Sequence, residues 1–286
     1  MGLSPKTILM KTPLAMLYLP ILLIGMGCDS DQTSNDGGVA GSQQVRIDFL
    51  GQVGSEAYEC GSTYAGLGLG PSELTPSDFR LFISEVELLD ESGIGHAVSL
   101  DQDGKWQFDN VALLDFDNGC AGGNTDQNSA VLGNVESGTY VGIRFTLGVP
   151  FEHNHIDSST APAPLSLTSM FWGWQQGYKF VRIEGASSGL PGWRFHLGST
   201  GCNGDARGNV TMCSEPNRAT IELVGFDPTS VPIVVDLASL VSGSDLEEDT
   251  GGAEGCMGSL GDPECAAFFN TVGLSAGSTQ VFFRQP

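Results

Sequence analysis

Apolar and polar residues alternate along much of the chain with the period of a β-strand. The clearest case is TYVGIRFTLGV (139–149), in which every second residue from Val141 to Val149 is apolar, while Arg144 and Thr146 stand between them. Neighbouring side chains of a strand point to opposite faces, so this pattern predicts a strand with one buried face. Similar segments, bounded by Gly, Pro, Asn or Asp, predict strands over residues 45–53, 79–89, 105–116, 178–185, 193–197, 219–226 and 280–285.

Helical periodicity is scarce by comparison. Only residues 236–243 and 263–269 have the pattern of short helices, and the 40 glycines and 14 prolines favour turns and long loops. No internal repeat is visible, and no linker divides the chain after residue 45. We therefore predict an all-β fold: a single β-sandwich domain over residues 45–286, with long disulfide-stapled loops and one or two short helices.

The first residues have the layout of a secretory signal. Lys6 and Lys11 precede an apolar stretch, LAMLYLPILLIGMG, which ends at Cys28 and is too short to span a bilayer. We expect residues 1–28 to be a signal peptide that resembles the lipoprotein type, with Cys28 as the lipidated residue; an ordinary signal peptide cut nearby is the alternative. Residues 29–44 are then a flexible tether. The protein is expected to be exported, either periplasmic or anchored to the outer membrane of a bacterium.

The chain is strongly acidic, with 34 Asp and Glu, 12 Lys and Arg, and a net charge of −22. Two of the lysines lie in the expected signal, which leaves 10 basic residues and a charge of −24 after residue 27. Such a surface repels nucleic acid and attracts cations, so we expect no nucleic-acid partner.

Six cysteines follow Cys28, and an even number in an exported chain favours disulfides. Their spacing favours two local pairs, Cys202 with Cys213 and Cys256 with Cys265, which leaves Cys60 to pair with Cys120. Thiolate metal ligands are the alternative, but no two of these cysteines have CxxC spacing.

Residues 151–196 hold three of the four histidines and three of the four tryptophans. Imidazole binds soft transition-metal ions, copper above all. His153 and His155 follow a predicted strand and, in extended backbone, would project to the same side. His196 alternates with the apolar residues of WRFHL, so it should point to solvent or into a cleft.

Two tryptophans, Trp172 and Trp174, flank Gly173 in the segment MFWGWQ. The glycine gives a metal or a partner close access to the backbone. Packing in the core is the alternative role for these side chains, because most tryptophans are largely buried.

Taken in order, these segments resemble the MbnP-like family of exported bacterial copper-binding proteins, also called metallo-mystery-pair four-cysteine-motif proteins. The resemblance covers about residues 45–285. It is carried by DFRLFISEVELL, GKWQFDNVALLDFDNG, GTYVGIRFTLGVPFEHNHIDSSTAPAPLSLTSMFWGWQQGYKFVRIE, GWRFHLGSTGC, PNRATIELVGFDP and CMGSLGDPEC. The resemblance implies that the four cysteines of the family name are Cys202, Cys213, Cys256 and Cys265.

The resemblance also implies a partner and a modification. Family members are encoded beside a di-haem enzyme similar to MauG and bacterial cytochrome c peroxidases, which oxidises a tryptophan of the WxW segment to kynurenine near bound copper. In this chain the modified residue would be Trp174 or Trp172, with a slight preference for Trp174. The implied copper ligands are His155, His196 and the kynurenine. The protein would be substrate and metal carrier, with no enzyme activity of its own.

The family pattern NH-x-D matches Asn154-His155-Ile156-Asp157 and leaves His153 outside, as a further candidate ligand only. An alternative function uses all three histidines, His153, His155 and His196, to bind zinc in a hydrolase with an open fourth position. Asp157 or Glu152 would then serve as general base. A third reading is a surface lipoprotein whose aromatic segment is entirely core.

Overall fold

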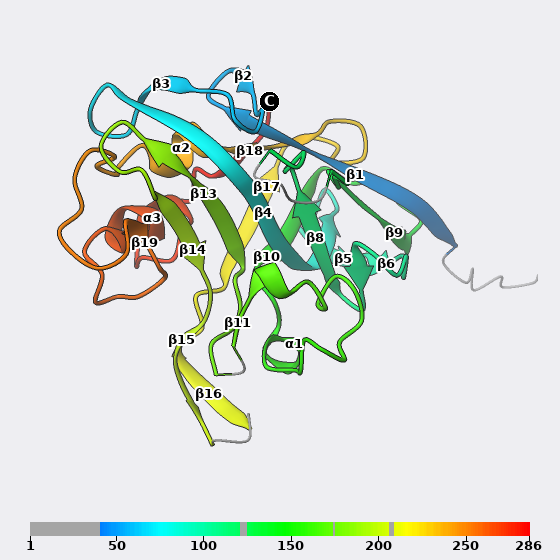
Figure 1. The fold of residues 1–286 in the computed structure, drawn as a ribbon. Helices are drawn as coiled ribbons and strands as arrows, with labels where there is room; N and C mark the ends of the chain where they lie inside the picture. The colour runs from blue at the N-terminus through cyan, green and yellow to red at the C-terminus, as the bar shows by residue number, and fades with distance from the viewer. Residues whose placement is uncertain (1–40, 121–124, 174, 206–208) are drawn as a thin grey trace, which may run out of the picture. The chain divides into compact units, whose positions relative to one another are not determined.

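The chain folds as an all-β sandwich of two sheets, as the sequence predicts (Figure 1). The computed structural model describes residues 41–120, 125–173, 175–205 and 209–286. Expected features at residues 1–40, including the signal, the lipidation of Cys28 and most of the tether, lie outside these residues, as does Trp174. No helix within the described ranges is long and apolar enough to cross a membrane.

The larger sheet is organised around one long strand, β4 (Ser72–Leu89). Its strand order is β17-β10-β4-β13-β14-β19; β3, β5 and β8 also pair with β4, and β7 pairs with β8. The bounds are β3 Tyr64–Leu67, β5 Gly95–Ala97, β7 Gln107–Phe108, β8 Val111–Asp115, β10 Gly142–Leu147, β13 Val181–Ser187, β14 Arg194–Leu197, β17 Ala219–Val224 and β19 Gly255–Cys256.

The smaller sheet has the order β20-β18-β1-β9-β6, with β2 paired to β1. The bounds are β1 Ser42–Val53, β2 Glu56–Ala57, β6 Ser99–Leu100, β9 Ala130–Glu136, β18 Ile233–Asp236 and β20 Phe283–Arg284. β1 begins three residues before the expected domain boundary. It pairs antiparallel with β9 and parallel with β18.

The main core lies between the two sheets. Phe49 of β1 meets Phe145 of β10 edge-on, with ring centroids 5.9 Å apart. The predicted alternation of β10 is confirmed, because Ile143, Phe145 and Leu147 are fully buried while Arg144 pairs on the other face with glutamates of β4 and β17. The core includes apolar side chains from both sheets.

A second, smaller core cluster holds the loop between β10 and β13. It consists of Phe82, Val111, Leu113, Val149, Leu165, Met170, Tyr178 and Phe180. The Tyr178 hydroxyl donates to the Leu165 carbonyl at 2.6 Å, and its ring packs edge-on against Phe82 and Phe171. This cluster therefore fixes the segment that carries His153, His155 and Trp172.

That loop contains helix α1 (Phe151–Asn154), a short 3₁₀ turn η1 (Thr168–Met170), and a hairpin of β11 (Phe171–Gly173) and β12 (Gly177–Tyr178). A separate ribbon of β15 (Thr200–Gly204) and β16 (Val210–Glu215) follows β14 and lies at the same end of the fold as β11 and α1 (Figure 1). Helices α2 (Leu237–Val241) and α3 (Cys265–Thr271) occupy the two segments expected to be helical.

All three predicted disulfides are present: Cys60–Cys120, Cys202–Cys213 and Cys256–Cys265. Cys202 and Cys213 lie opposite each other in the β15–β16 ribbon. The Cys256–Cys265 bond joins β19 to α3, and both of its cysteines are fully buried. The long loops are thus stapled as expected.

Candidate metal centre

His196 lies on β14 with its ring on the face opposite the main core. Trp193, Phe195 and Leu197 are buried in that core, so the predicted alternation is correct. Of the two expected surroundings, solvent or a cleft, the structure rules out open solvent, because only 4% of His196 is exposed. The indole of Trp172, from hairpin strand β11, lies beside the imidazole with ring centroids 6.1 Å apart.

The two ring nitrogens of His196 have different surroundings. Nε2 lies 2.8 Å from Oε1 of Glu184 on β13, and Arg182 donates two hydrogen bonds of 2.9 Å to the same carboxylate. Nδ1 is buried and has no hydrogen-bond partner among the described residues. Burial lowers the pKa of His196, whereas the hydrogen bond from His196 holds the pKa of Glu184 well below its usual range.

These pKa shifts describe a neutral imidazole beside a carboxylate at neutral pH. Nε2 then carries the hydrogen and donates a hydrogen bond to Glu184, so the lone pair of the ring is on the buried Nδ1. Metal-bound histidines commonly have this arrangement, in which a carboxylate holds the ring nitrogen that does not bind the ion. The donor set at His196 therefore fits a metal ligand.

Trp172 reaches His196 because glycine stands opposite its ring. A Cβ placed on Gly198 would lie 2.7 Å from Cζ3 of Trp172 and 2.6 Å from the Tyr178 carbonyl oxygen. A Cβ placed on Gly258 would lie 3.6 Å from Cη2 of the indole, an ordinary contact distance. The close approach of the hairpin to β14 thus depends on the absence of a side chain at Gly198.

His153 and His155 do not lie in extended backbone, which corrects the prediction that they project to the same side. Pro150 starts helix α1 instead, and its carbonyl accepts hydrogen bonds from the backbone N–H groups of His153 and Asn154. Proline fits before the first turn, where a backbone N–H has no helical partner. His153 turns to Asp109, with Nε2 at 2.7 Å from its Oδ2, and packs against Phe108.

His155 instead faces the disulfide ribbon. Its Nε2 lies 3.5 Å from Sγ of Cys213, and its ring packs edge-on against Phe151 at 5.0 Å. The neighbouring Asn154 is only 1% exposed, accepts from the Tyr178 N–H at 2.8 Å and donates to the Ser199 hydroxyl at 3.2 Å. Asn154 thereby joins α1 to both the hairpin and the start of the ribbon.

The β11–β12 hairpin contacts one expected histidine ligand, His196, directly and also contacts the ribbon next to the other, His155. Trp172 lies against His196, while the side chain of Gln175 donates to the Cys202 carbonyl at 3.0 Å, in the ribbon that contacts His155. The described residues contain no cluster of three ligand atoms that joins His153, His155 and His196. His153 therefore faces a different part of the fold, and the three-histidine zinc site is not assembled.

The structure also reveals two residues that the sequence did not single out, namely Glu184 and Gly198. Glu184 and Arg182 are two residues apart on β13, so they lie on the same polar face of the strand. Its meeting with His196 depends on the pairing of β13 with β14, in which Arg182 is opposite His196. That register is a tertiary feature, and nothing in the local sequence of Glu184 specifies it.

The MbnP family model matches residues 42–258 of this chain. The chain belongs to the MbnP family. The structure of MbnP from Methylosinus trichosporium is similar to it, with a TM-score of 0.75 and 30% sequence identity over 86% of this chain and 98% of that chain. A search of curated proteins found no match. The resemblance inferred from the sequence is thus confirmed at the level of the family and the fold.

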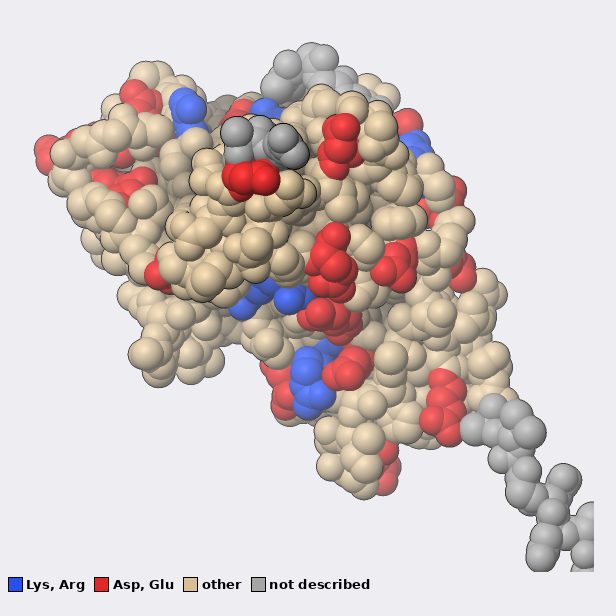
Figure 2. All heavy atoms as spheres, turned by 90° about the horizontal axis from the view of Figure 1, so that it is seen from below, with Lys and Arg blue, Asp and Glu red and all other residues tan. Residues whose placement is uncertain are grey.

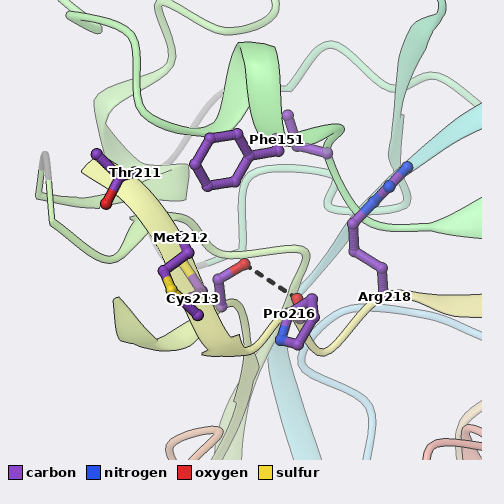
Figure 3. Close-up of a pocket in the computed structure, with 8 residues that line it drawn as sticks. Phe151, Thr211, Met212, Cys213, Pro216 and Arg218 are labelled. Carbon is purple, nitrogen blue, oxygen red and sulfur yellow. Dashed lines mark hydrogen bonds between the residues drawn. The ribbon is translucent and has the colours of Figure 1, made fainter. Parts of the chain in front are cut away.

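In this MbnP-family chain a pocket of about 300 Å³ opens beside the ribbon (Figure 3). Phe151, Met212, Cys213, Pro216 and the stem of Arg218 surround it, and the Ser199 hydroxyl donates to the Pro216 carbonyl at its base. The walls are mostly apolar. Cys213, which contacts His155, is among them, so the pocket gives access to that part of the candidate site.

Acidic side chains are scattered across the face at this end of the molecule, where basic side chains are few (Figure 2). This distribution agrees with the net charge of −22. Such a field raises the local concentration of cations and disfavours anionic partners.

Proposed function

We propose that this protein is an exported copper-binding protein of the MbnP family, without catalytic activity of its own. The observation that carries the proposal is the buried, unpartnered Nδ1 of His196 beside the indole of Trp172. A buried nitrogen without a hydrogen bond is costly unless something binds it. Copper is a suitable occupant because imidazole is among its preferred ligands.

His155 is the second proposed ligand. It lies in the loop fixed by the smaller core cluster, and Asn154 connects its segment to Ser199, three residues after His196. Two neutral imidazoles and one weaker nitrogen donor suit copper in either oxidation state. The third donor is proposed to be the aromatic amine of kynurenine, formed from a tryptophan of the WxW segment.

Trp172 is supported as the modified residue by its contact with His196. Trp174, which the sequence slightly favours, lies outside the described residues and stays the alternative. The partner is proposed to be a di-haem enzyme similar to MauG and bacterial cytochrome c peroxidases. Kynurenine formation breaks the indole C2–C3 bond by oxidation and then releases C2 as formate by hydrolysis, so it needs an external oxidant, which a haem cofactor can use.

Export is part of the same proposal, with residues 1–28 as the signal and Cys28 as the lipidated residue. Mass spectrometry of the N-terminal peptide from a bacterial membrane fraction tests this directly. A diacylglycerol-modified Cys28 is expected. A mature protein that begins elsewhere and stays in the soluble periplasmic fraction would contradict the anchor.

Copper analysis of histidine variants tests the metal centre. The wild-type protein should retain a single copper ion after dialysis, and His196→Ala and His155→Ala should each lose it. His96→Ala is the matched control, because His96 is bound to Asp90 and Glu136 through its two ring nitrogens. Full copper retention in the double variant of His155 and His196 would refute the assignment.

Co-expression with the di-haem partner tests the modification. Peptide mass spectrometry should find kynurenine at Trp172 or Trp174 only when the partner is active. Trp172→Phe and Trp174→Phe identify which residue reacts. If both tryptophans stay intact beside an active partner supplied with peroxide, the proposed modification is wrong.

A further inference from the structure

Beyond the proposed copper site, a second set of soft ligands lies at the β15–β16 ribbon. His155 Nε2 and the sulfur atoms of Cys202 and Cys213 all lie within 4.8 Å of one another. We infer that opening the Cys202–Cys213 disulfide converts this cluster into a metal site for Zn²⁺ or Cu⁺, held by two thiolates and one imidazole. The site shares His155 with the proposed copper site but does not use His196, so it can be tested separately with His196 replaced.

One pair of ligands already has the spacing that coordination requires. Zinc binds thiolate sulfur at about 2.3 Å and imidazole nitrogen at about 2.0–2.1 Å, so a tetrahedral ion places these two atoms about 3.6 Å apart. The distance from His155 Nε2 to Cys213 Sγ is 3.5 Å. A single ion between these atoms therefore needs little movement of α1 relative to the ribbon.

The two sulfur atoms stay close to each other after the bond opens. Cys202 and Cys213 are directly opposite in the ribbon, and the pairs Thr200–Glu215 and Asn203–Met212 flank them. Two thiolates on one zinc ion lie about 3.8 Å apart, so the sulfurs must separate beyond bonding distance. Since the ribbon is a two-stranded sheet of its own, this change does not require either main sheet to open.

The imidazole presents its unprotonated nitrogen to the cluster. The Asn154 amide has a defined orientation, because its Oδ1 accepts from the Tyr178 N–H. Its Nδ2 then faces His155 Nε2 at 3.2 Å. An amide nitrogen only donates, so Nε2 is the unprotonated acceptor in this contact, and a metal ion would bind its lone pair in place of the Asn154 hydrogen bond.

A reductant can reach this disulfide more readily than the Cys256–Cys265 bond. Cys213 borders the pocket beside the ribbon (Figure 3), whereas Cys256 and Cys265 are 0% exposed. An external dithiol supplies two electrons and two protons: the S–S bond breaks, two protein thiols form, and the dithiol becomes a disulfide. Binding of the metal ion then displaces the two thiol protons.

The test uses the His196→Ala variant, which removes one of the proposed copper ligands and keeps His155, Cys202 and Cys213. The protein is reduced without oxygen by a dithiol bound to a resin, and removal of the resin leaves no chelating thiol reagent in solution. Zn²⁺ binding is then measured by titration in competition with a chromophoric chelator. Alkylation and peptide mapping identify the cysteines that opened. Reduced protein should bind one Zn²⁺ per chain, and Co²⁺ in its place should give sulfur-to-metal charge-transfer bands; oxidised protein should do neither.

Matched variants assign the ligands. His155→Ala keeps both thiols and should weaken zinc binding at least tenfold, and Cys202→Ser with Cys213→Ser should abolish it. Cys60→Ser with Cys120→Ser is the control, since these cysteines form a separate cluster with Asp117. The inference is overturned if zinc binding survives loss of Cys202 and Cys213, or is lost with Cys60 and Cys120. It is also overturned if mapping shows Cys202 and Cys213 reduced but no zinc bound, or still joined after the reduction.

Discussion

Replacing Glu184 with Gln should lower the affinity for copper by about 10- to 100-fold, the usual effect of losing the group that orients a metal-bound histidine. This range corresponds to about 1.4–2.7 kcal/mol of binding free energy. Glu184 accepts a hydrogen bond from Nε2 of His196 at 2.8 Å, and Arg182 donates one hydrogen bond to each oxygen of the same carboxylate. Glutamine keeps the shape of the side chain but removes its charge and one of the two acceptor oxygens.

The same contact should contribute to folding. Hydrogen bonds to charged groups contribute about 1.5–3 kcal/mol, and partial exposure of Glu184 reduces this, so we expect Glu184→Gln to lower the free energy of unfolding by about 1–2 kcal/mol. Burial lowers the pKa of His196 from 6.5. The neutral imidazole therefore contributes its full stabilisation above pH 6.5, and this stabilisation is lost as the pH falls through the pKa that His196 has in the folded protein. Protonation of Glu184, whose pKa is lowered from 4.5, removes the pair at still lower pH.

Competition with a chromophoric Cu⁺ chelator at neutral pH measures the affinity, and urea denaturation measures the stability. Glu87→Gln is the matched control, because Glu87 accepts from Arg144 at 2.9 Å and its side chain is 35% exposed against 31% for Glu184. Both variants change the net charge equally. If they bind copper equally well, Glu184 does not orient a ligand and the assignment of the His196 nitrogens is wrong.

Three further predictions concern packing, crosslinking and a buried acid. Gly198→Ala should displace Trp172, change its near-ultraviolet circular dichroism and destabilise the fold by about 1–3 kcal/mol; an unchanged spectrum would contradict the tight contact. Replacing Cys256 and Cys265 with Ser should lower the free energy of unfolding by about 3 kcal/mol in urea, from loop entropy; no loss would contradict it. Burial raises the pKa of Asp115 to about 7. Its folded pKa lies above the unfolded value, so Asp115→Asn should gain stability over wild type as the pH rises from 3.8 to about 7; parallel pH profiles would contradict this.

Much of the sandwich could be predicted because the alternation of apolar and polar residues in a strand is a property of its local sequence. The β10 pattern of apolar positions around Arg144 has one interpretation, and the structure buries those positions in the main core. Several strands were not predicted from the sequence, and two of them, β18 and β9, show opposite reasons. β18 (Ile233–Asp236) is a short, continuous apolar run, which periodicity cannot distinguish from a helix segment. β9 (Ala130–Glu136) alternates only weakly, because Gly133 breaks its pattern.

The candidate site was predictable in its residue types but not in its geometry. The sequence identified His155, His196 and the WxW segment, yet it placed His153 and His155 in extended backbone. Pro150 follows the predicted strand, whereas in the structure it also precedes helix α1, and this local helical turn points the two imidazoles toward different partners, Asp109 and Cys213. The sequence left open whether His196 faces solvent or a cleft, because the cover supplied by Trp172 comes from a hairpin more than twenty residues away in sequence.

The geometry of the proposed metal centre depends on the smaller core cluster as well as on the strand that carries His196. β14 is held in the larger sheet by β13 and β19, so the His196 ring is fixed by the main fold. Trp172 and His155, in contrast, belong to the loop that Tyr178 and its neighbours pack onto that sheet. A change inside this cluster should therefore alter the distance between the two proposed ligands without unfolding the sandwich. Under the proposed function, this separation would let the main fold hold one ligand rigidly while the loop adjusts when its tryptophan is modified.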